Sequence, residues 1–375
     1  MDFNLTEEQR DIQKAAREFA QGEFDPDLTI EMDQAGKFPE SIWKKAARLG
    51  FIGIHYPEEY GGQGFGLFEA ILTVEAFCRV DSGLGSALCS VDRGVEVILK
   101  FGSDGQKRNL LPPLAKGEKR LTVAFAESED AWGLSLLAAS AKREADGYLL
   151  QGEKRFVANG PLADTFLIVC REPKEGLINL IVDKVDGIEI LPVEKVGLRT
   201  IPFGDLRLRG VRVPLEMRIG GEDEGSAQVL HFHQTMGLKS AAQALGMAQG
   251  AFDRAMQYAK QREQFGRRLS QFQVIRHKLA DMVVSIEVSR WLTYKAAAEY
   301  DQGKNEGDSL SIAQIEAGRR LISVVDEALQ IFGGYGYMAE QEIEHYYRDA
   351  WAIGAELGTE EEHKDEIARR ALGGS

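Results

Sequence analysis

The sequence predicts an α+β protein in which two helical regions flank a β region. Helical periodicity dominates residues 1–120 and again residues 226–375, whereas residues 121–225 contain short apolar runs broken by turn residues. No helical segments alternate with these runs, so a parallel sheet with crossover helices is not expected. We therefore expect three domains: a helical N-terminal domain, a β-barrel or sandwich in the middle, and a C-terminal helical bundle.

A capping signal and apolar periodicity support the N-terminal helices. Thr6 and Gln9 form a capping box, and the apolar residues after them recur at helical spacing: Ile12, Ala15, Ala16 and Phe19. The segment 56–64 reads Tyr-Pro-Glu-Glu-Tyr-Gly-Gly-Gln-Gly and predicts a loop. Helical spacing then resumes from Phe68 to about Phe101.

Turn residues and helix length define the other two regions. Asp146-Gly147 and Asp186-Gly187 are dipeptides that favour tight hairpin turns between strands. From Ser226 onward, apolar residues keep a spacing of three to four over long segments. Such helices are typical of a bundle, here a four-helix bundle that also buries a subunit interface.

Composition narrows the classes of function. The 375 residues carry a net charge of −14, which disfavours nucleic acid as a partner. No stretch reaches the ~18 apolar residues that cross a bilayer, and the N-terminus resembles no targeting signal. The three cysteines (Cys78, Cys89 and Cys170) form no CxxC motif. We expect a cytoplasmic protein without a metal site or membrane insertion.

Four motifs could bind a ligand, and each also has a simpler structural explanation. The glycine cluster in 330–336 would admit a bulky anion, or would merely cap a helix. Arg262-Glu263-Gln264-Phe265-Gly266 suits phosphate, or is a solvated charge cluster. In 152–160 an aromatic residue lies beside a turn, where it could stack on a cofactor or pack in the core. Segments 347–350 and 358–361 could be a salt-bridged helix end.

The order and spacing of these motifs together resemble the acyl-CoA dehydrogenase family over essentially the whole chain. Segment 56–62 is similar to the family's P-E-x-x-G-G loop, and segments 197–199 and 211–214 are similar to the end of its β domain. The resemblance implies a helical N-terminal domain, a middle β-barrel and a C-terminal helical bundle.

The resemblance also implies the cofactor and the partners. FAD would be held by Phe125, Ser128, Phe156, Ala158, Arg262, Phe272, Gln273, Gln330, Gly333, Gly334, Thr359 and Glu361. Segment 330–334 would reach the FAD of a neighbouring subunit, which implies a homotetramer built as a dimer of dimers. The substrate would be an acyl-CoA thioester, and an electron-transferring flavoprotein or a similar acceptor would take the electrons.

The chain departs from the family at the base that removes the substrate proton. The family's glutamate lies between the Y-R-D-A and G-T motifs, but an ungapped alignment puts Leu357 there and Glu356 where a tyrosine is usual. The second base position known in the family falls near Met236, with Gly237 in place of a common arginine. Neither leucine nor methionine can accept a proton, so the base must lie elsewhere.

Asp92 is the first candidate for this base, and Glu356 is the runner-up. Asp92 belongs to a segment that resembles the helix lining the family's acyl pocket, although it could also be an N-cap or a surface residue paired with Arg93. By the resemblance, the substrate would contact Asp92, Leu134, Leu357 and Gly358. The chain differs from the family at two further places: it has Gly133-Leu134-Ser135 where the family has G-S-D, and Ala158 where the family has a threonine. These differences put the family's hydrogen bonds to the thioester and the flavin in doubt.

A base at a different position suggests that the enzyme removes a different proton from its substrate. An acyl group with a double bond between Cα and Cβ has no ordinary α-proton, but its γ-proton is acidic. The sequence resembles the branch of the family that converts cyclohex-1-ene-1-carboxyl-CoA to cyclohexa-1,5-diene-1-carboxyl-CoA by 1,4-elimination in anaerobic bacteria. The alternatives are α,β-dehydrogenation of cyclohexanecarboxyl-CoA or another short or branched acyl-CoA, an acyl-CoA oxidase, and a non-catalytic flavin- or CoA-binding paralogue.

Overall fold

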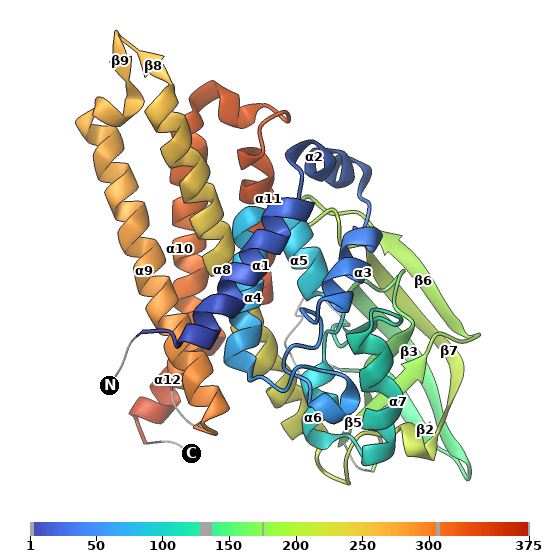
Figure 1. Cartoon of the computed structure of the whole chain (residues 1–375). Coiled ribbons are helices and arrows are strands. Elements are labelled where there is room, and N and C mark those ends of the chain that lie inside the picture. Colours follow the sequence, from blue (N-terminus) through green and yellow to red (C-terminus); the bar gives the residue numbers. More distant parts are fainter. Residues whose placement is uncertain (1–3, 128–136, 175, 305–307, 374–375) are drawn as a thin grey trace.

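The computed structural model describes residues 4–127, 137–174, 176–304 and 308–373. It shows the predicted succession of helices, sheet and helices, with the N-terminal helices between the long C-terminal helices on one side and the sheet on the other (Figure 1). The main N-terminal helices are α1 (Glu7–Glu23), α2 (Pro26–Ala35), α3 (Glu40–Arg48), α4 (Leu67–Val80), α5 (Ser82–Cys89), α6 (Val95–Phe101) and α7 (Asp104–Ala115).

The capping box at the start of α1 is confirmed. The backbone N–H of Gln9 donates to Thr6 Oγ1 at 3.2 Å, and the N–H of Thr6 donates to Gln9 Oε1 at 3.0 Å. These bonds satisfy two donors that a helix start otherwise leaves free. Ala16 and Ala20 on the same helix are fully buried, and α1 packs on α4.

The middle region is one curled sheet of seven strands. The strands are β1 (Leu121–Ala124), β2 (Ser140–Arg143), β3 (Gly147–Ala158), β4 (Thr165–Glu172), β5 (Gly176–Asp183), β6 (Ile188–Val193) and β7 (Phe203–Pro214). They pair in the order β1-β4-β2-β3-β7-β6, with β5 on the other edge of β4. Most pairs are antiparallel, but β1 runs parallel to β4 over its four residues.

One of the two predicted hairpins is confirmed and the other is wrong. Asp146-Gly147 lies in the turn between β2 and β3, which pair antiparallel. Asp186-Gly187 joins β5 to β6, and these strands do not pair, because β5 lies beside β4 and β6 beside β7. The dipeptide therefore makes a turn that sends the chain to another part of the sheet.

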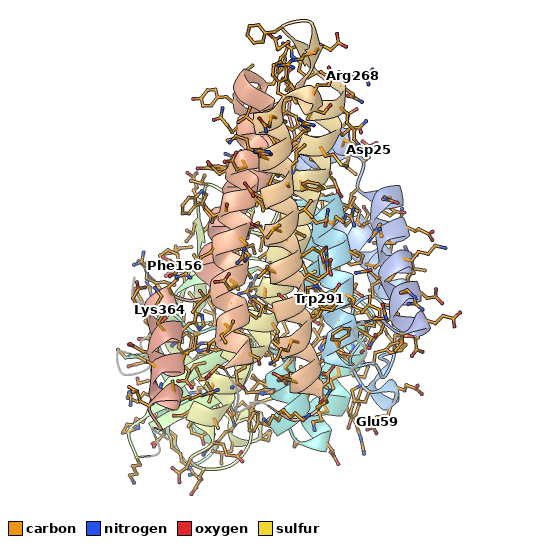
Figure 2. All side chains as sticks on the ribbon, turned by 90° about the vertical axis from the view of Figure 1, so that its left-hand side faces the viewer. Asp25, Glu59, Phe156, Arg268, Trp291 and Lys364 are labelled. Carbon is orange, nitrogen blue, oxygen red and sulfur yellow. The ribbon has the colours of Figure 1, made fainter. Side chains whose placement is uncertain are left out.

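The C-terminal region consists of α8 (Gly225–Gln261), α9 (Gln273–Asp301), α10 (Ser309–Phe332), α11 (Ile343–Glu356) and α12 (Glu360–Ala371). Glycines let α8 approach α4 closely: a Cβ atom on Gly246 would lie 2.4 Å from the Glu75 carbonyl oxygen, and one on Gly250 would lie 2.3 Å from that of Arg79. Figure 2 shows Trp291 projecting from the middle of α9. No helix of the described residues is long and apolar enough to span a membrane.

Candidate active site

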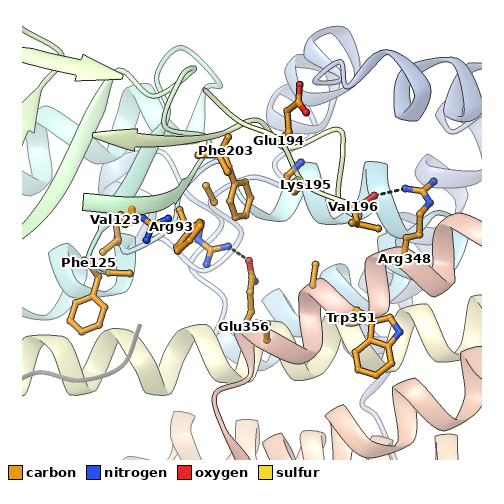
Figure 3. A pocket seen from close by; sticks show the side chains of 18 of the residues that line it. Arg93, Val123, Phe125, Glu194, Lys195, Val196, Phe203, Arg348, Trp351 and Glu356 are labelled. Atoms are coloured by element: carbon orange, nitrogen blue, oxygen red, sulfur yellow. Dashed lines mark hydrogen bonds and ion pairs between the residues drawn. The ribbon is translucent and has the colours of Figure 1, made fainter. Parts of the chain in front are cut away.

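A cavity of about 730 Å³ lies between the sheet, α11 and the segment 193–197 (Figure 3). Its wall is mostly apolar and is made by Val123, Phe125, Ala126, Phe156, Ala158, Val193, Val196, Gly197, Phe203, Phe232, Tyr347, Trp351, Ala352 and Ala355. The charged residues in the wall are Arg93, Arg155, Glu194, Lys195, Arg348 and Glu356. A cavity that is mainly apolar with a few charged groups is typical of a binding site for an organic ligand.

A bulge in β3 turns Phe156 toward this cavity. The β3–β7 register shifts between Lys154 and Val157, and Phe156 has a φ of +55°, which is unfavourable for a residue with a Cβ atom. Its backbone N–H leaves the ladder and donates to Asp205 Oδ1 at 2.9 Å. The ring remains 40% exposed. A strained backbone that presents an apolar ring to a cavity indicates a binding surface.

Buried Lys154 holds the neighbouring edge of the cavity. Its Nζ donates to the Phe125 carbonyl oxygen at 3.1 Å and to Glu127 Oε1 at 2.5 Å. The Glu127 carboxylate also accepts the backbone N–H of Ala139 at 3.0 Å. This ion pair therefore ties the end of β1 to β3 just behind Phe125.

The cavity fits the ring system of FAD. Phe125, Phe156 and Ala158, predicted from the sequence as cofactor contacts, all lie in its wall. Phe156 and Trp351 leave apolar ring surface uncovered, 40% and 56% exposed, which a planar aromatic ligand would cover. When bound there, FAD supplies the hydride acceptor.

A second cleft, of about 550 Å³, brings together two other motifs. Arg262 lies there beside Gly333 and Gly334, and its guanidinium is 5.5 Å from the centre of the Tyr335 ring. An added Cβ atom on either glycine would meet nothing within 4 Å, so the backbone is open to a ligand. The predicted cofactor residues are thus divided between two separate places on the chain.

Other predicted cofactor residues lie near the ends of helices, outside the walls of both cavities. Phe272 precedes α9 with the Arg267 guanidinium 3.9 Å from its ring centre, and Gln273 and Gln330 are exposed. Thr359 caps α12 by accepting the Glu362 N–H at 3.3 Å. Glu361 is exposed in the first turn of α12. The predicted contacts Ser128 and Leu134 lie outside the described residues.

The Tyr-Arg-Asp-Ala motif anchors α11 to the segment that borders the cavity. Buried Asp349 accepts the Leu198 N–H at 2.5 Å and the Ser82 hydroxyl at 2.7 Å. Arg348 donates to the Val196 carbonyl oxygen at 2.9 Å and to Asp33 at 2.7 Å. The motif therefore lies in the middle of α11, not at a helix end, and its ion pairs and hydrogen bonds shape one wall of the cavity.

Sequence reasoning missed several residues of the wall. Arg155, Lys195, Phe203 and Trp351 were not singled out, although Lys195 lies two residues before the segment that resembles the end of the family's β domain. Burial lowers the pKa of Lys195 to about 8, while Asp349 and Asp33 act in the opposite direction. With a pKa of about 8, Lys195 is mostly charged at pH 7 and loses its charge as the pH rises above about 8.

Glu356, the last residue of α11, faces the cavity. Its Oε1 accepts a hydrogen bond from Arg93 Nη1 at 3.0 Å (Figure 3). Its Oε2 is buried and has no partner among the described residues. Leu357 is 3% exposed and lies against Gly318 of α10, outside the cavity wall. Gly358 follows with a φ of +87°. Leu357, which the ungapped alignment places at the family's base position, is thus packed in the core.

Asp92 is buried but does not line this cavity. Its carboxylate accepts the Tyr56 hydroxyl at 2.7 Å and lies 3.6 Å from Lys239 Nζ. It borders a separate cavity of about 40 Å³, whereas Arg93, the next residue, borders the large one. Asp92 is 6% exposed and therefore not a surface residue, and the structure does not bring it together with Phe156 and Glu356. Its role as a base stays a prediction.

Within the described ranges, no three His, Cys, Asp or Glu side chains gather as metal ligands would.

Comparison with known proteins agrees with this geometry. Three family models match in order: the N-terminal domain of acyl-CoA dehydrogenases at residues 6–118, the middle domain at 124–211 and the C-terminal domain at 223–372. The chain is 35% identical to 3-(aryl)acrylate reductase of Clostridium sporogenes, covering 98% of this chain and 99% of that one. It is also 35% identical to the CarC subunit of the caffeyl-CoA reductase–Etf complex of Acetobacterium woodii, covering 92% and 93%.

A solved structure confirms the architecture. Butyryl-CoA dehydrogenase from Megasphaera elsdenii superimposes with a TM-score of 0.94 at 33% identity, covering 99% of this chain and all of that one. The predicted acyl-CoA dehydrogenase fold and the FAD cofactor are thereby confirmed. The chain belongs to the acyl-CoA dehydrogenase family, and it is an FAD-dependent oxidoreductase.

Proposed function

We propose that this chain dehydrogenates an alicyclic acyl-CoA, with cyclohex-1-ene-1-carboxyl-CoA as substrate and cyclohexa-1,5-diene-1-carboxyl-CoA as product. The observation that carries the proposal is Leu357. At the position where the family has its glutamate base there is a leucine, 3% exposed and packed against α10. No group at that position can remove a proton from Cα, which suits a substrate whose C1 is already planar.

The bond changes in this reaction balance without any further reactant. A base takes a proton from C3 of the ring, and the resulting anion is delocalised into the thioester. FAD, when bound, would supply the acceptor for the hydride that leaves C6, and the C1=C2 double bond is replaced by a conjugated diene. The base must come within hydrogen-bond reach of C3. The apolar wall around Phe125, Phe156 and Phe203 suits a carbocyclic ring.

The geometry favours Glu356 over Asp92 as this base. Glu356 lies in the wall of the cavity that fits FAD, and one of its oxygens has no partner among the described residues. Asp92 is engaged by Tyr56 and Lys239 and borders a different, much smaller cavity. The sequence pattern ranks the two carboxylates in the opposite order, and variants of both residues decide between them.

A second candidate is α,β-dehydrogenation of cyclohexanecarboxyl-CoA or another short or branched acyl-CoA. It is favoured by the same carboxylate, since Glu356 is one residue from the ordinary base and could reach Cα of a saturated acyl group. The names of two relatives refer to arylacrylate and caffeyl-CoA, whose acyl groups are already conjugated. Reduction of such a double bond is the reverse of α,β-dehydrogenation, so these names support this second candidate.

The proposal extends to partners. The first cavity and the second cleft hold different sets of predicted FAD contacts, which supports an assembly in which the second cleft of one subunit completes the site of another. We propose a homotetramer. One relative is a subunit of a reductase–Etf complex, which supports an electron-transferring flavoprotein as the acceptor.

Anaerobic flavin bleaching by the two thioesters tests the proposal, with Glu356→Gln and Asp92→Asn beside the wild type. We expect the cyclohexene thioester to bleach the wild type and Glu356→Gln to slow bleaching by at least ~10²-fold with FAD retained, the lower range for loss of a general base. Faster bleaching by the saturated thioester would favour the second candidate. A yellow protein that neither thioester bleaches would contradict both and point to a non-catalytic paralogue.

A further inference from the structure

The wall of the large cavity holds four cations, and among the described residues each of them lies beside a carboxylate. The pairs are Arg93 with Glu356, Arg155 with Asp205, Arg348 with Asp33, and Lys195 with Asp349, which attracts its ammonium group. Glu194, which is exposed, adds a further negative charge to the wall. An anion that enters the cavity therefore meets only cations whose charge is already balanced.

Arg93 and Glu356 reach this wall from two different parts of the chain. Arg93 comes from the turn before α6, and Glu356 is the last residue of α11 (Figure 3). Both side chains are 16% exposed, and Arg93 Nη1 donates to Glu356 Oε1 at 3.0 Å. The second carboxylate oxygen, Glu356 Oε2, is buried and has no partner among the described residues. The pair therefore contains an acceptor without a donor, but no unbalanced positive charge.

Backbone contacts fix the turn from which Arg93 projects. The preceding residue, Asp92, forms a β-bridge with Leu121 at the start of β1. The following residue, Gly94, has a φ of +88°, and a Cβ atom on it would lie 2.4 Å from the Val123 side chain. A turn packed this closely leaves Arg93 little room to withdraw, so the cavity must accept or reject a ligand with the pair in place.

We propose that Arg93 and Glu356 together determine substrate specificity: they admit uncharged acyl groups and exclude acyl groups that carry a second carboxylate. A carboxylate beside the pair would lie next to Glu356 without a cation of its own. An unpaired charge in a mainly apolar cavity is strongly unfavourable. Glu356 also occupies the guanidinium of Arg93, which would otherwise suit a carboxylate well.

The inference rests on the proposed function, in which the ring of the acyl group lies in this cavity with C3 within reach of Glu356. A substituent on C3 would then meet the pair directly. The inference concerns the charge that the cavity accepts and not the removal of a proton. Binding without any reaction is therefore sufficient to test it.

Two aromatic thioesters of nearly equal size provide this test: 3-carbamoylbenzoyl-CoA and 3-carboxybenzoyl-CoA. Both have a planar six-membered ring, and they differ only in the amide or carboxylate on C3. An aromatic ring has no hydride to lose, so calorimetric titration of the oxidised holoenzyme measures binding alone. We expect the amide to bind the wild type at least ~10-fold more tightly than the carboxylate, a factor equal to about 1.4 kcal/mol.

Variants of the pair should change this preference in a defined order. Glu356→Gln keeps the length of the side chain but leaves Arg93 without a carboxylate. We expect the preference to reverse, because arginine binds carboxylates through charge-assisted hydrogen bonds. When Arg93→Met is added to Glu356→Gln, the carboxylate should again bind more weakly than the amide. Glu194→Gln is the matched control, because it removes a carboxylate of the same wall that lies outside the pair, and it should keep the wild-type preference.

Several results would overturn the inference. Equal affinities of the two thioesters for the wild type, tighter binding of the carboxylate, or no binding of either would do so without any variant. A wild-type preference that persists in Glu356→Gln would show that Glu356 does not exclude the charge. A reversal that survives the addition of Arg93→Met, or that also occurs in Glu194→Gln, would remove Arg93 or the pair from the explanation. If a variant of the pair does not retain FAD, the wild-type ratio of affinities decides.

This outcome is separable from that of the proposed function. If neither the cyclohexene nor the saturated thioester bleaches the wild-type flavin, the proposed function fails, and the ratio of the two affinities still tests the inference. If the cyclohexene thioester bleaches the flavin while the two aromatic thioesters bind equally, the proposed function holds and the inference fails.

Discussion

Gly237 of α8 lies directly against Gln314 of α10: a Cβ atom on Gly237 would come within 1.9 Å of Gln314 Nε2. The same amide donates to the Leu357 carbonyl oxygen at 3.4 Å. The sequence showed only that a common arginine is missing at this position. The structure adds that the space is taken by Gln314, which supports the turn after α11 where the ordinary base would lie.

Replacing Gly237 by alanine should displace the Gln314 amide and leave the Leu357 carbonyl with one partner fewer. We expect the free energy of unfolding to fall by about 1–3 kcal/mol, the range for a disturbed buried hydrogen bond. Chemical denaturation of the holoenzyme measures it. Gly22→Ala, in α1 with nothing within 4 Å of the added methyl, is the control and should be neutral or stabilising. Equal effects of the two substitutions would contradict the prediction.

Lys154 is a second position where one side chain supports the cavity wall. It is fully buried, and its removal leaves the Glu127 carboxylate without its cation. Lys154→Met should therefore lower the free energy of unfolding by about 3–5 kcal/mol, the range for breaking a buried ion pair. The double variant Lys154→Met with Glu127→Gln should recover part of this loss, because no uncompensated charge remains. Chemical denaturation of the single and the double variant measures the loss and the recovery. Equal free energies of unfolding for the single and the double variant would contradict the expected recovery.

His345 and Asp81 give the fold a pH dependence. His345 Nε2 lies 2.9 Å from Asp81 Oδ2, and both side chains are almost fully buried. Burial lowers the pKa of His345, but Asp81 outweighs this effect and raises it above its ordinary value. A group with a raised folded pKa stabilises the fold below its unfolded pKa, about 6.5 for histidine.

The stability from this pair should therefore be complete below about pH 6.5 and should be lost as the pH rises through the raised pKa of His345. The slope is at most about 1.4 kcal/mol per pH unit for one proton. Denaturation of the wild type and of His345→Gln between pH 6 and 9 measures it. In His345→Gln this contribution to the pH dependence of the free energy of unfolding should disappear. His277→Gln, at an exposed position, should keep the pH dependence of the wild type.

Local patterns in the sequence were sufficient for the layout and for part of the site. The capping box at Thr6 and the turn at Asp146-Gly147 involve residues a few positions apart, so their geometry follows from the pattern itself. Phe156 and Ala158, which are predicted to contact FAD, both lie in the cavity wall, and their motif lies within one strand. Asp186-Gly187 was misjudged, because a turn dipeptide does not determine which strands pair.

Features that depend on distant residues could not be predicted. One partner of Asp92 is Lys239, which lies on α8, and no periodicity in the sequence links the two. Adjacent residues Asp92 and Arg93 line different cavities, and Asp92 forms a bridge with Leu121, which is distant in the sequence. The ranking of Asp92 over Glu356 depended on these directions, which only the packed chain defines.

Arg262 tests whether the second cleft serves the cofactor. It shares that cleft with Gly333, Gly334 and Tyr335, and an arginine beside open backbone suits the phosphates of a dinucleotide. Arg262→Gln should raise the dissociation constant of FAD by about tenfold or more, the effect of losing one charge-assisted hydrogen bond of about 1.5–3 kcal/mol. Arg268→Gln is the matched control, because Arg268 lies on the same hairpin, is 61% exposed and pairs with Glu263. Titration of the apoprotein with FAD measures both, and an unchanged affinity in Arg262→Gln would exclude this cleft from the cofactor site.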